Sequence, residues 1–202
     1  HKKNMKICLT IDDVIRNKTK AFIKAYNKEK GTDIDPDTFV PTSAVLSDMF
    51  KFKSMKDFYR FLYDDYHFEI FGEAEQCTRM LDKKLNLWLI EQNDNLEMEG
   101  KKADFMLVNL REFNQSIGDT YFYLSKIATR IREVFFPKDP DDVWKKCDIL
   151  ITADPYLIEN KPEGKTVVKI EMPYNKDKTA DFTYKNLEEL LSDKEFITKV
   201  GI

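Results

Sequence analysis

Two adjacent aspartates, Asp12 and Asp13, follow a short apolar run near the start of the chain, in the stretch Met5–Asn17 (MKICLTIDDVIRN). Carboxylates at the carboxyl end of a buried strand commonly take part in metal or phosphate chemistry. An aspartate just before a helix is also a favoured cap, worth about 1 kcal/mol. Asp154, which precedes Pro155, has the same capping interpretation because Asp before Pro is a common helix start. A chemical role and a capping role therefore both stay open for Asp12, Asp13 and Asp154.

Four β-favouring runs predict the sheet that would position these side chains. The runs lack polar alternation, as strands of a buried parallel sheet do, and they are residues 6–11, 104–109, 148–153 and 166–172. A helical pattern after the first run extends to about Lys30, and Gly31 ends it. Apolar residues at spacings of three or four over residues 111–135 predict one long helix that Pro137 ends.

Residues 33–95 have a different character, because no strand-like run occurs there. One helical stripe holds Met55, Phe58, Leu62 and Tyr66, and a second stripe runs through Cys77, Leu81 and Trp88. The pattern predicts an α/β fold with a three-layer, Rossmann-like parallel sheet and a helical cap insertion after the first strand. The predicted domains are an α/β core of residues 1–30 and 96–202 and an insertion of residues 31–95.

Composition limits the class of protein and its partners. The chain is 42% hydrophobic, and its net charge of -3 comes from 33 basic and 36 acidic residues that are mixed along it. It has no basic field of the kind that nucleic-acid binding needs, so no nucleic acid is predicted. Cys8, Cys77 and Cys147 are far apart and predict free thiols in the cytoplasm. No apolar run is long enough for a membrane span, so no membrane is expected.

The segment 58–71 contains more aromatic side chains than one helix face can bury. We expect part of them to form core and the remainder to contact a protein partner or a second copy of the chain. The expected contact residues are Phe58, Tyr59, Tyr63 and Tyr66. His67 is expected to be packed or solvated rather than catalytic, and Trp88 and Trp144 are expected in the core or at its boundary.

The order of elements resembles the haloacid dehalogenase-like (HAD) phosphohydrolases, and within them the 5'(3')-deoxyribonucleotidase group. The most specific stretch is Cys147–Asn175 (CDILITADPYLIENKPEGKTVVKIEMPYN), which looks like that group's late strand, Pro-containing turn, Gly-Lys turn and final PYN. The resemblance implies a HAD-like fold. Because bacteriophages carry many members of the group, the resemblance also implies a phage as one origin of the chain. A phage-encoded protein would lie in the host cytoplasm or in the virion.

The resemblance also implies roles for single positions. In such enzymes an aspartate ending the first strand attacks the phosphate, and an aspartate two residues on acts as acid and base. A threonine or serine after the second strand holds the phosphate, and acidic residues after the late strand complete a magnesium site. Thr10 stands at the nucleophile position, Asp12 at the acid/base position and Asn109 at the phosphate-binding position. Thr152 and Ala153 replace the acidic pair.

These replacements predict a disabled site in which Asp12 is vestigial. Thr10 is a poor nucleophile without an adjacent base, and it cannot supply the anionic oxygen that Mg²⁺ prefers. We therefore expect no cofactor and a structural or binding role in a larger assembly. The alternative is an atypical Mg²⁺ site of Asp12, Asp13 and Asp154 that acts on (deoxy)nucleoside monophosphates, and nucleotide binding without hydrolysis is a third possibility. The family's lysine has three candidates here: Lys126, Lys138 and Lys145.

Overall fold

The computed structural model describes residues 4–202, and its centre is a sheet of six strands in the order β5-β4-β1-β6-β7-β8. Every neighbouring pair is parallel. The strands are β1 (Asn4–Thr10), β4 (Lys102–Val108), β5 (Glu133–Phe135), β6 (Ile149–Thr152), β7 (Thr166–Ile170) and β8 (Phe182–Tyr184). The predicted parallel sheet is confirmed, and the four predicted strands form its four central members.

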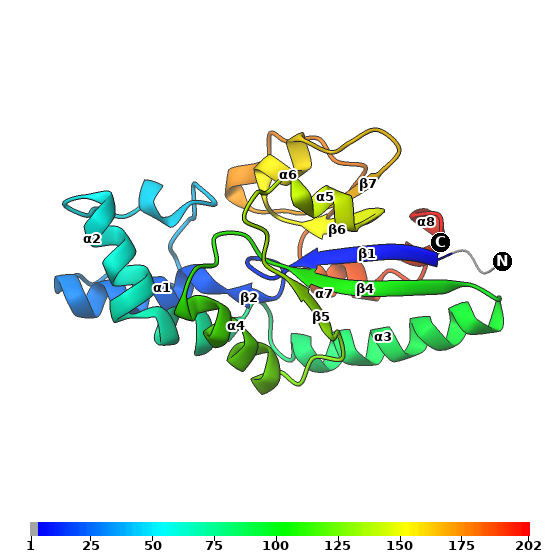
Figure 1. Cartoon of the computed structure of the whole chain (residues 1–202), viewed down its shortest axis with the longest axis horizontal. Coiled ribbons are helices and arrows are strands. Elements are labelled where there is room, and N and C mark those ends of the chain that lie inside the picture. The colour runs from blue at the N-terminus through cyan, green and yellow to red at the C-terminus, as the bar shows by residue number, and fades with distance from the viewer. Residues whose placement is uncertain (1–3) are drawn as a thin grey trace.

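Helices cover both faces of this sheet, which gives the predicted three layers (Figure 1). Ile7 and Leu9 of β1 face the layer of α3 (Leu81–Met98), α7 (Leu187–Ser192) and α8 (Phe196–Lys199). Cys8, between them, faces the layer of α5 (Asp142–Lys146) and α6 (Pro155–Glu159). The strand is apolar without alternation because both of its faces are buried. Trp88 and Trp144 are confirmed as core residues, one in each layer.

The insertion extends away from the sheet after β1 (Figure 1). A two-stranded antiparallel ribbon of β2 (Arg16–Asn17) and β3 (Glu75–Gln76) joins it to the core. Between these strands lie α1 (Lys18–Lys30), a 3-10 turn (Leu46–Asp48), α2 (Met55–Tyr59) and two short helices of π type, Arg60–Asp65 and Phe68–Gly72. Gly31 ends α1 in the left-handed conformation, as predicted.

Packing divides the chain differently from the predicted boundaries at residues 31–95. The apolar side of α1, with Phe22 and Tyr26, packs in the cluster of the insertion. The apolar side of α3, with Leu85 and Trp88, packs against the sheet. By their contacts, α1 belongs to the insertion and α3 to the core. The predicted boundaries instead place α1 in the core and most of α3 in the insertion.

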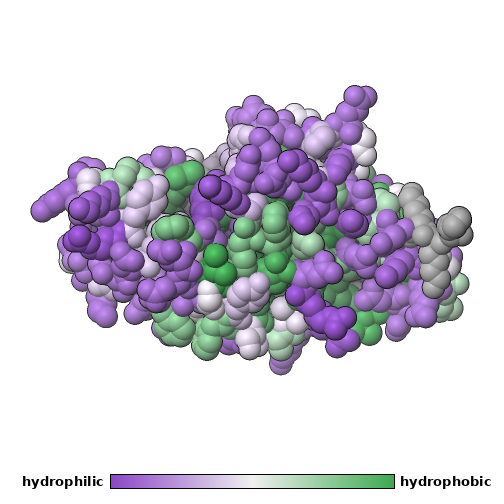
Figure 2. Space-filling model, in the orientation of Figure 1, coloured by the Kyte–Doolittle hydropathy of each residue, from purple (hydrophilic) through white to green (hydrophobic). Residues whose placement is uncertain are grey.

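The aromatic residues of the insertion mostly contact one another. Of the four expected contact residues, Phe58 and Tyr63 are buried in this core, Tyr66 is half-buried and Tyr59 is 51% exposed. A contact with a partner stays a prediction. The π-type turns, such as the bond from Tyr66 N to Phe61 O, rotate successive side chains differently from an α-helix. Residues of α1 and of the segment 46–52 pack against these turns, so more than one face of the segment 58–71 is covered. Figure 2 shows a largely hydrophilic outer end of the insertion on this side.

The predicted helix over 111–135 is only partly correct. The observed α4 (Gln115–Lys126) is capped by Ile127, and Ala128 then takes a left-handed backbone conformation with φ of 51°. Residues 133–135 form the edge strand β5 beside β4. The apolar spacing continued through both segments because each buries a side chain against the same core, including Ile131 from the connecting loop.

Candidate functional site

The turn after β1 is built from main-chain bonds rather than by aspartate capping. Ile15 N and Arg16 N both donate to Ile11 O, at 2.9 and 3.0 Å. Asp13 has a positive φ of 65°, and its N–H donates to Arg16 O at 2.9 Å. The residue that caps α1 is Asn17, whose side chain accepts from the backbone of the helix. The capping interpretation is therefore wrong for Asp12 and Asp13.

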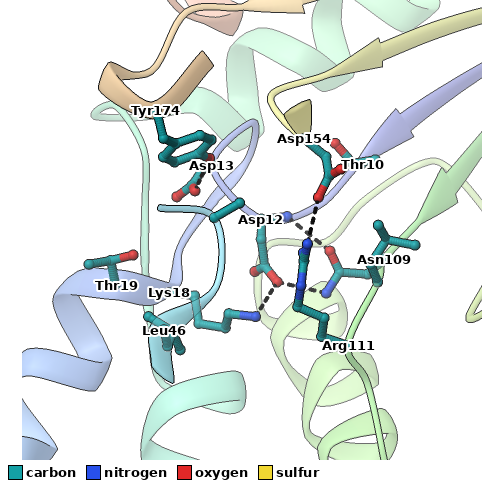
Figure 3. Close-up of a pocket in the computed structure, with 12 residues that line it drawn as sticks. Thr10, Asp12, Asp13, Lys18, Thr19, Leu46, Asn109, Arg111, Asp154 and Tyr174 are labelled. Carbon is teal, nitrogen blue, oxygen red and sulfur yellow. Dashed lines mark hydrogen bonds and ion pairs between the residues drawn. The ribbon is translucent and has the colours of Figure 1, made fainter. Parts of the chain in front are cut away.

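The same interpretation is confirmed for Asp154. Its side chain accepts a hydrogen bond from Leu157 N at 3.1 Å at the start of α6, and Pro155 takes the first helical position. The other carboxylate oxygen accepts a hydrogen bond from Arg111 Nη2 at 3.0 Å (Figure 3). Asp154 is 8% exposed, so both of its oxygens are held within the protein.

Asp12 lies at the centre of a cluster of polar side chains (Figure 3). Its carboxylate contacts Arg16 Nε, Lys18 Nζ and Asn109 Nδ2, each at 2.8 Å. Asn109 Oδ1 also accepts from Asp12 N at 3.1 Å, so the two residues bond reciprocally. Burial alone would raise the pKa of Asp12, but the charges of Arg16 and Lys18 hold that pKa well below its ordinary value. The acid/base position thus carries a carboxylate whose charged form is favoured and whose charge Arg16 and Lys18 neutralise.

Arg16 extends this cluster into the core. The side chain is fully buried, and its Nη1 donates to Phe71 O in the insertion and to Thr120 Oγ1 in α4, both at 2.8 Å. Nη2 pairs with Glu112 Oε2 at 2.9 Å, and the Glu112 side chain is also fully buried. The guanidinium carbon lies 5.4 Å from the ring centres of both Phe71 and Tyr123. One side chain therefore links the turn after β1, the insertion and α4.

Sequence reasoning missed Arg16, Lys18 and Glu112. Arg16 follows Asp12 by four positions, the one local signal for a pair, but no helix connects them in the structure. Glu112 reaches the cluster only through the fold of the chain after β4. Of the candidate lysines, Lys126 donates to Gly72 O and Lys145 pairs with Asp142.

Thr10 at the nucleophile position bonds to another hydroxyl. Thr10 Oγ1 donates to Thr152 Oγ1 at 2.9 Å, and Thr152 Oγ1 in turn accepts from Asp154 N at 3.0 Å. Thr10 is 4% exposed and Thr152 fully buried. The hydroxyl of Thr10 therefore faces a neutral oxygen where activation as a nucleophile requires a base.

Asp13 points away from this cluster toward Tyr174 (Figure 3). Its carboxylate accepts the Tyr174 hydroxyl at 2.5 Å. Burial raises the pKa of Asp13 to about 6, the charge of Asp12 acts in the same direction, and the bond from Tyr174 opposes both. Burial, together with the Asp13 carboxylate, also raises the pKa of the Tyr174 hydroxyl well above its ordinary value.

The donor set does not fit a magnesium ion. Asp12 and Asp154 are paired with side-chain cations, and Asp13 is bonded to a tyrosine. Across residues 4–202 no group of three or more His, Cys, Asp or Glu side chains is arranged to hold a metal ion. The cavity between these residues has a volume of about 30 Å³, roughly one water molecule.

His67 lies outside this cluster and bonds to Asp119 through Nδ1 at 2.5 Å. It is partly buried, in line with the expectation of a packed residue.

No helix within residues 4–202 is long and apolar enough to cross a membrane.

No family model and no curated protein matches the sequence. Among solved structures, the chain is similar to the putative HAD-hydrolase YfnB from Bacillus subtilis, which was solved bound to magnesium. The identity is 12% and the TM-score 0.43, over 94% of this chain and 97% of that one. The strand order and the position of the insertion, rather than this likeness, define the fold of the chain.

Proposed function

We propose that this chain is a deoxyribonucleotidase-like protein of HAD type that no longer hydrolyses phosphate esters and serves as a structural or binding module of a larger assembly. The resemblance of Cys147–Asn175 to a group carried by bacteriophages makes a phage assembly the first candidate. The nucleophile position, Thr10, and the late-strand position, Thr152, hold hydroxyls that bond to each other.

The observation that carries this proposal is the environment of Asp12. Lys18 and Arg16 each lie 2.8 Å from its carboxylate oxygens, so two positive charges of the chain itself already neutralise it. A divalent cation would have to displace Lys18 and would meet repulsion from both side chains. Asp12 also stays ionised because its pKa is lowered, and it therefore makes a poor general acid at neutral pH.

A phosphate-release assay tests the proposal. We expect a panel of 5' and 3' deoxynucleoside monophosphates to release phosphate at the same background rate with Mg²⁺ and with a chelator. Turnover that depends on Mg²⁺ and disappears in Asp12→Asn would contradict the proposal. Tyr59→Phe, an exposed change in the insertion, is a matched control for contaminating phosphatase because it should leave any background rate unchanged.

The alternative function is an Mg²⁺-dependent nucleotidase with an atypical site of Asp12, Asp13 and Asp154. The pKa of Asp13, raised to about 6 by burial, favours it, because a carboxyl that titrates near neutrality can transfer protons. Loss of turnover in Asp13→Asn would support this reading. Binding of a nucleotide without hydrolysis would place its phosphate against Lys18, Asn109 and Arg111, which line the same cavity and would have to move apart because its volume is only about 30 Å³. Calorimetry with deoxynucleotides would detect such binding.

A further inference from the structure

The outward side of α3 carries a narrow stripe that residues 4–202 leave uncovered. The helix packs on the sheet through Leu81 and Leu85, and its other side lies at the border of the molecule (Figure 1). Leu87 is 58% exposed and Ile90 39% exposed on that border. With Lys83 before them and Asp94 after them, they form what we call the α3 stripe: Lys83, Leu87, Ile90 and Asp94.

The spacing of the α3 stripe is that of a helix-pairing seam. Its members are separated by four, three and four positions, the alternation that keeps one line of side chains facing a neighbouring helix. Leu87 and Ile90 supply the apolar middle, and the two charged residues flank it. The opposite side of α3 is already used for packing on the sheet, so the stripe is free to contact a second helix.

The charges of α3 favour an antiparallel neighbour. Lys83 stands in the first turn, whereas Asp94 and Glu97 stand toward the carboxyl end, which is the unfavourable order for the helix's own dipole. All three are exposed, and within residues 4–202 none of them forms an ion pair. A helix of the same sequence running in the opposite direction would place Lys83 beside Asp94 at both ends.

We propose that two copies of this chain associate through their α3 stripes in an antiparallel, two-fold symmetric dimer. With the symmetry axis between positions 88 and 89, Leu87 of each copy packs on Ile90 of the other. In the same register Lys83 of each copy pairs with Asp94 of the other. A single surface that is complementary to itself is what a two-fold interface requires. The inference rests on α3 alone and is independent of the proposed loss of catalysis.

The expected dimer is weak. The helix of 18 residues is about 27 Å long, and each copy contributes two apolar side chains to the seam. Such an interface lies at the small end of specific protein contacts, so we expect a dissociation constant on the order of micromolar. The equilibrium should therefore move visibly across the concentrations used in sedimentation.

A charge exchange tests the dimer by sedimentation equilibrium of the full chain. Lys83→Asp alone and Asp94→Lys alone should each raise the dissociation constant by about tenfold or more, because each places two like charges opposite one another. The double variant, Lys83→Asp with Asp94→Lys, should restore association to near the wild-type value. Restoration distinguishes pairing of these two residues from a general effect of charge.

Leu87→Glu tests the apolar contact of the proposed dimer, and this variant should be monomeric. Met55→Glu is its matched control, since Met55 is 51% exposed but lies on α2 in the insertion, and it should not change association. Circular dichroism equal to that of the wild type would show that the variants stay folded. A wild-type chain that is monomeric at every concentration would overturn the proposal. So would a dimer that Leu87→Glu leaves intact, or one that the double exchange fails to restore.

Discussion

Replacing Arg16 with methionine is expected to lower the free energy of unfolding by about 3–5 kcal/mol. The guanidinium is fully buried and satisfies Asp12, Glu112 and two oxygens elsewhere. Without it the buried Glu112 carboxylate loses its ion-pair partner, and the bonds from Arg16 to Phe71 O in the insertion and Thr120 in α4 are lost. Urea denaturation at neutral pH, with the midpoint and slope compared to wild type, measures the effect.

Two further variants make this expectation specific to the buried pair. Arg132→Met removes an exposed arginine by the same change of side chain and should cost less than about 1 kcal/mol. The double variant Arg16→Met with Glu112→Leu should be less destabilised than the sum of the two single changes, because no unpaired carboxylate remains. Equal losses for Arg16→Met and Arg132→Met would contradict the account of Arg16 as the central link.

Replacing Phe22 with alanine is expected to destabilise the insertion by about 3–5 kcal/mol. Phe22 is fully buried in α1, with ring centres at 4.7 Å from Phe50 and 5.2 Å from Phe61. Removing the ring would leave a cavity among rigid aromatic neighbours that cannot easily close. Near-ultraviolet circular dichroism during thermal unfolding follows these rings directly, and the variant should lose the signal at lower temperature.

Tyr59→Ala provides the comparison on the same aromatic segment. The Tyr59 side chain is 51% exposed, so its removal should cost clearly less than that of Phe22. The difference tests whether the aromatic residues form an internal core, as the packing shows, or a surface that waits for a partner. If the two variants were destabilised equally, the buried cluster would not be the main support of the insertion.

Periodic patterns predicted the fold because they reflect local burial. Strands β1, β4, β6 and β7 are buried on both faces, so their continuous apolar runs were readable in the sequence. The edge strands β5 and β8 have three residues each, too few to show a period. The helix over 111–135 was drawn too long because loop and strand residues there bury side chains at helix-like intervals.

The site was predicted in part, and the missing part is tertiary. Thr10, Asp12, Asn109 and Asp154 do come together at the carboxyl ends of neighbouring strands, as a parallel sheet requires. The partners of Asp12 were not predicted because Arg16 reaches it through a non-helical turn and Glu112 arrives from another part of the chain. The tertiary fold decides which opposite charge lies beside a buried carboxylate, so local sequence patterns do not predict that partner.

Calorimetric titration of Mg²⁺ into the full chain tests most directly the claim that the chain's own cations take up the charge of Asp12. We expect no saturable binding in the wild type, because Lys18 and Arg16 already contact that carboxylate at 2.8 Å. Saturable binding of Mg²⁺ by the wild type that is abolished in Asp12→Asn would contradict the account.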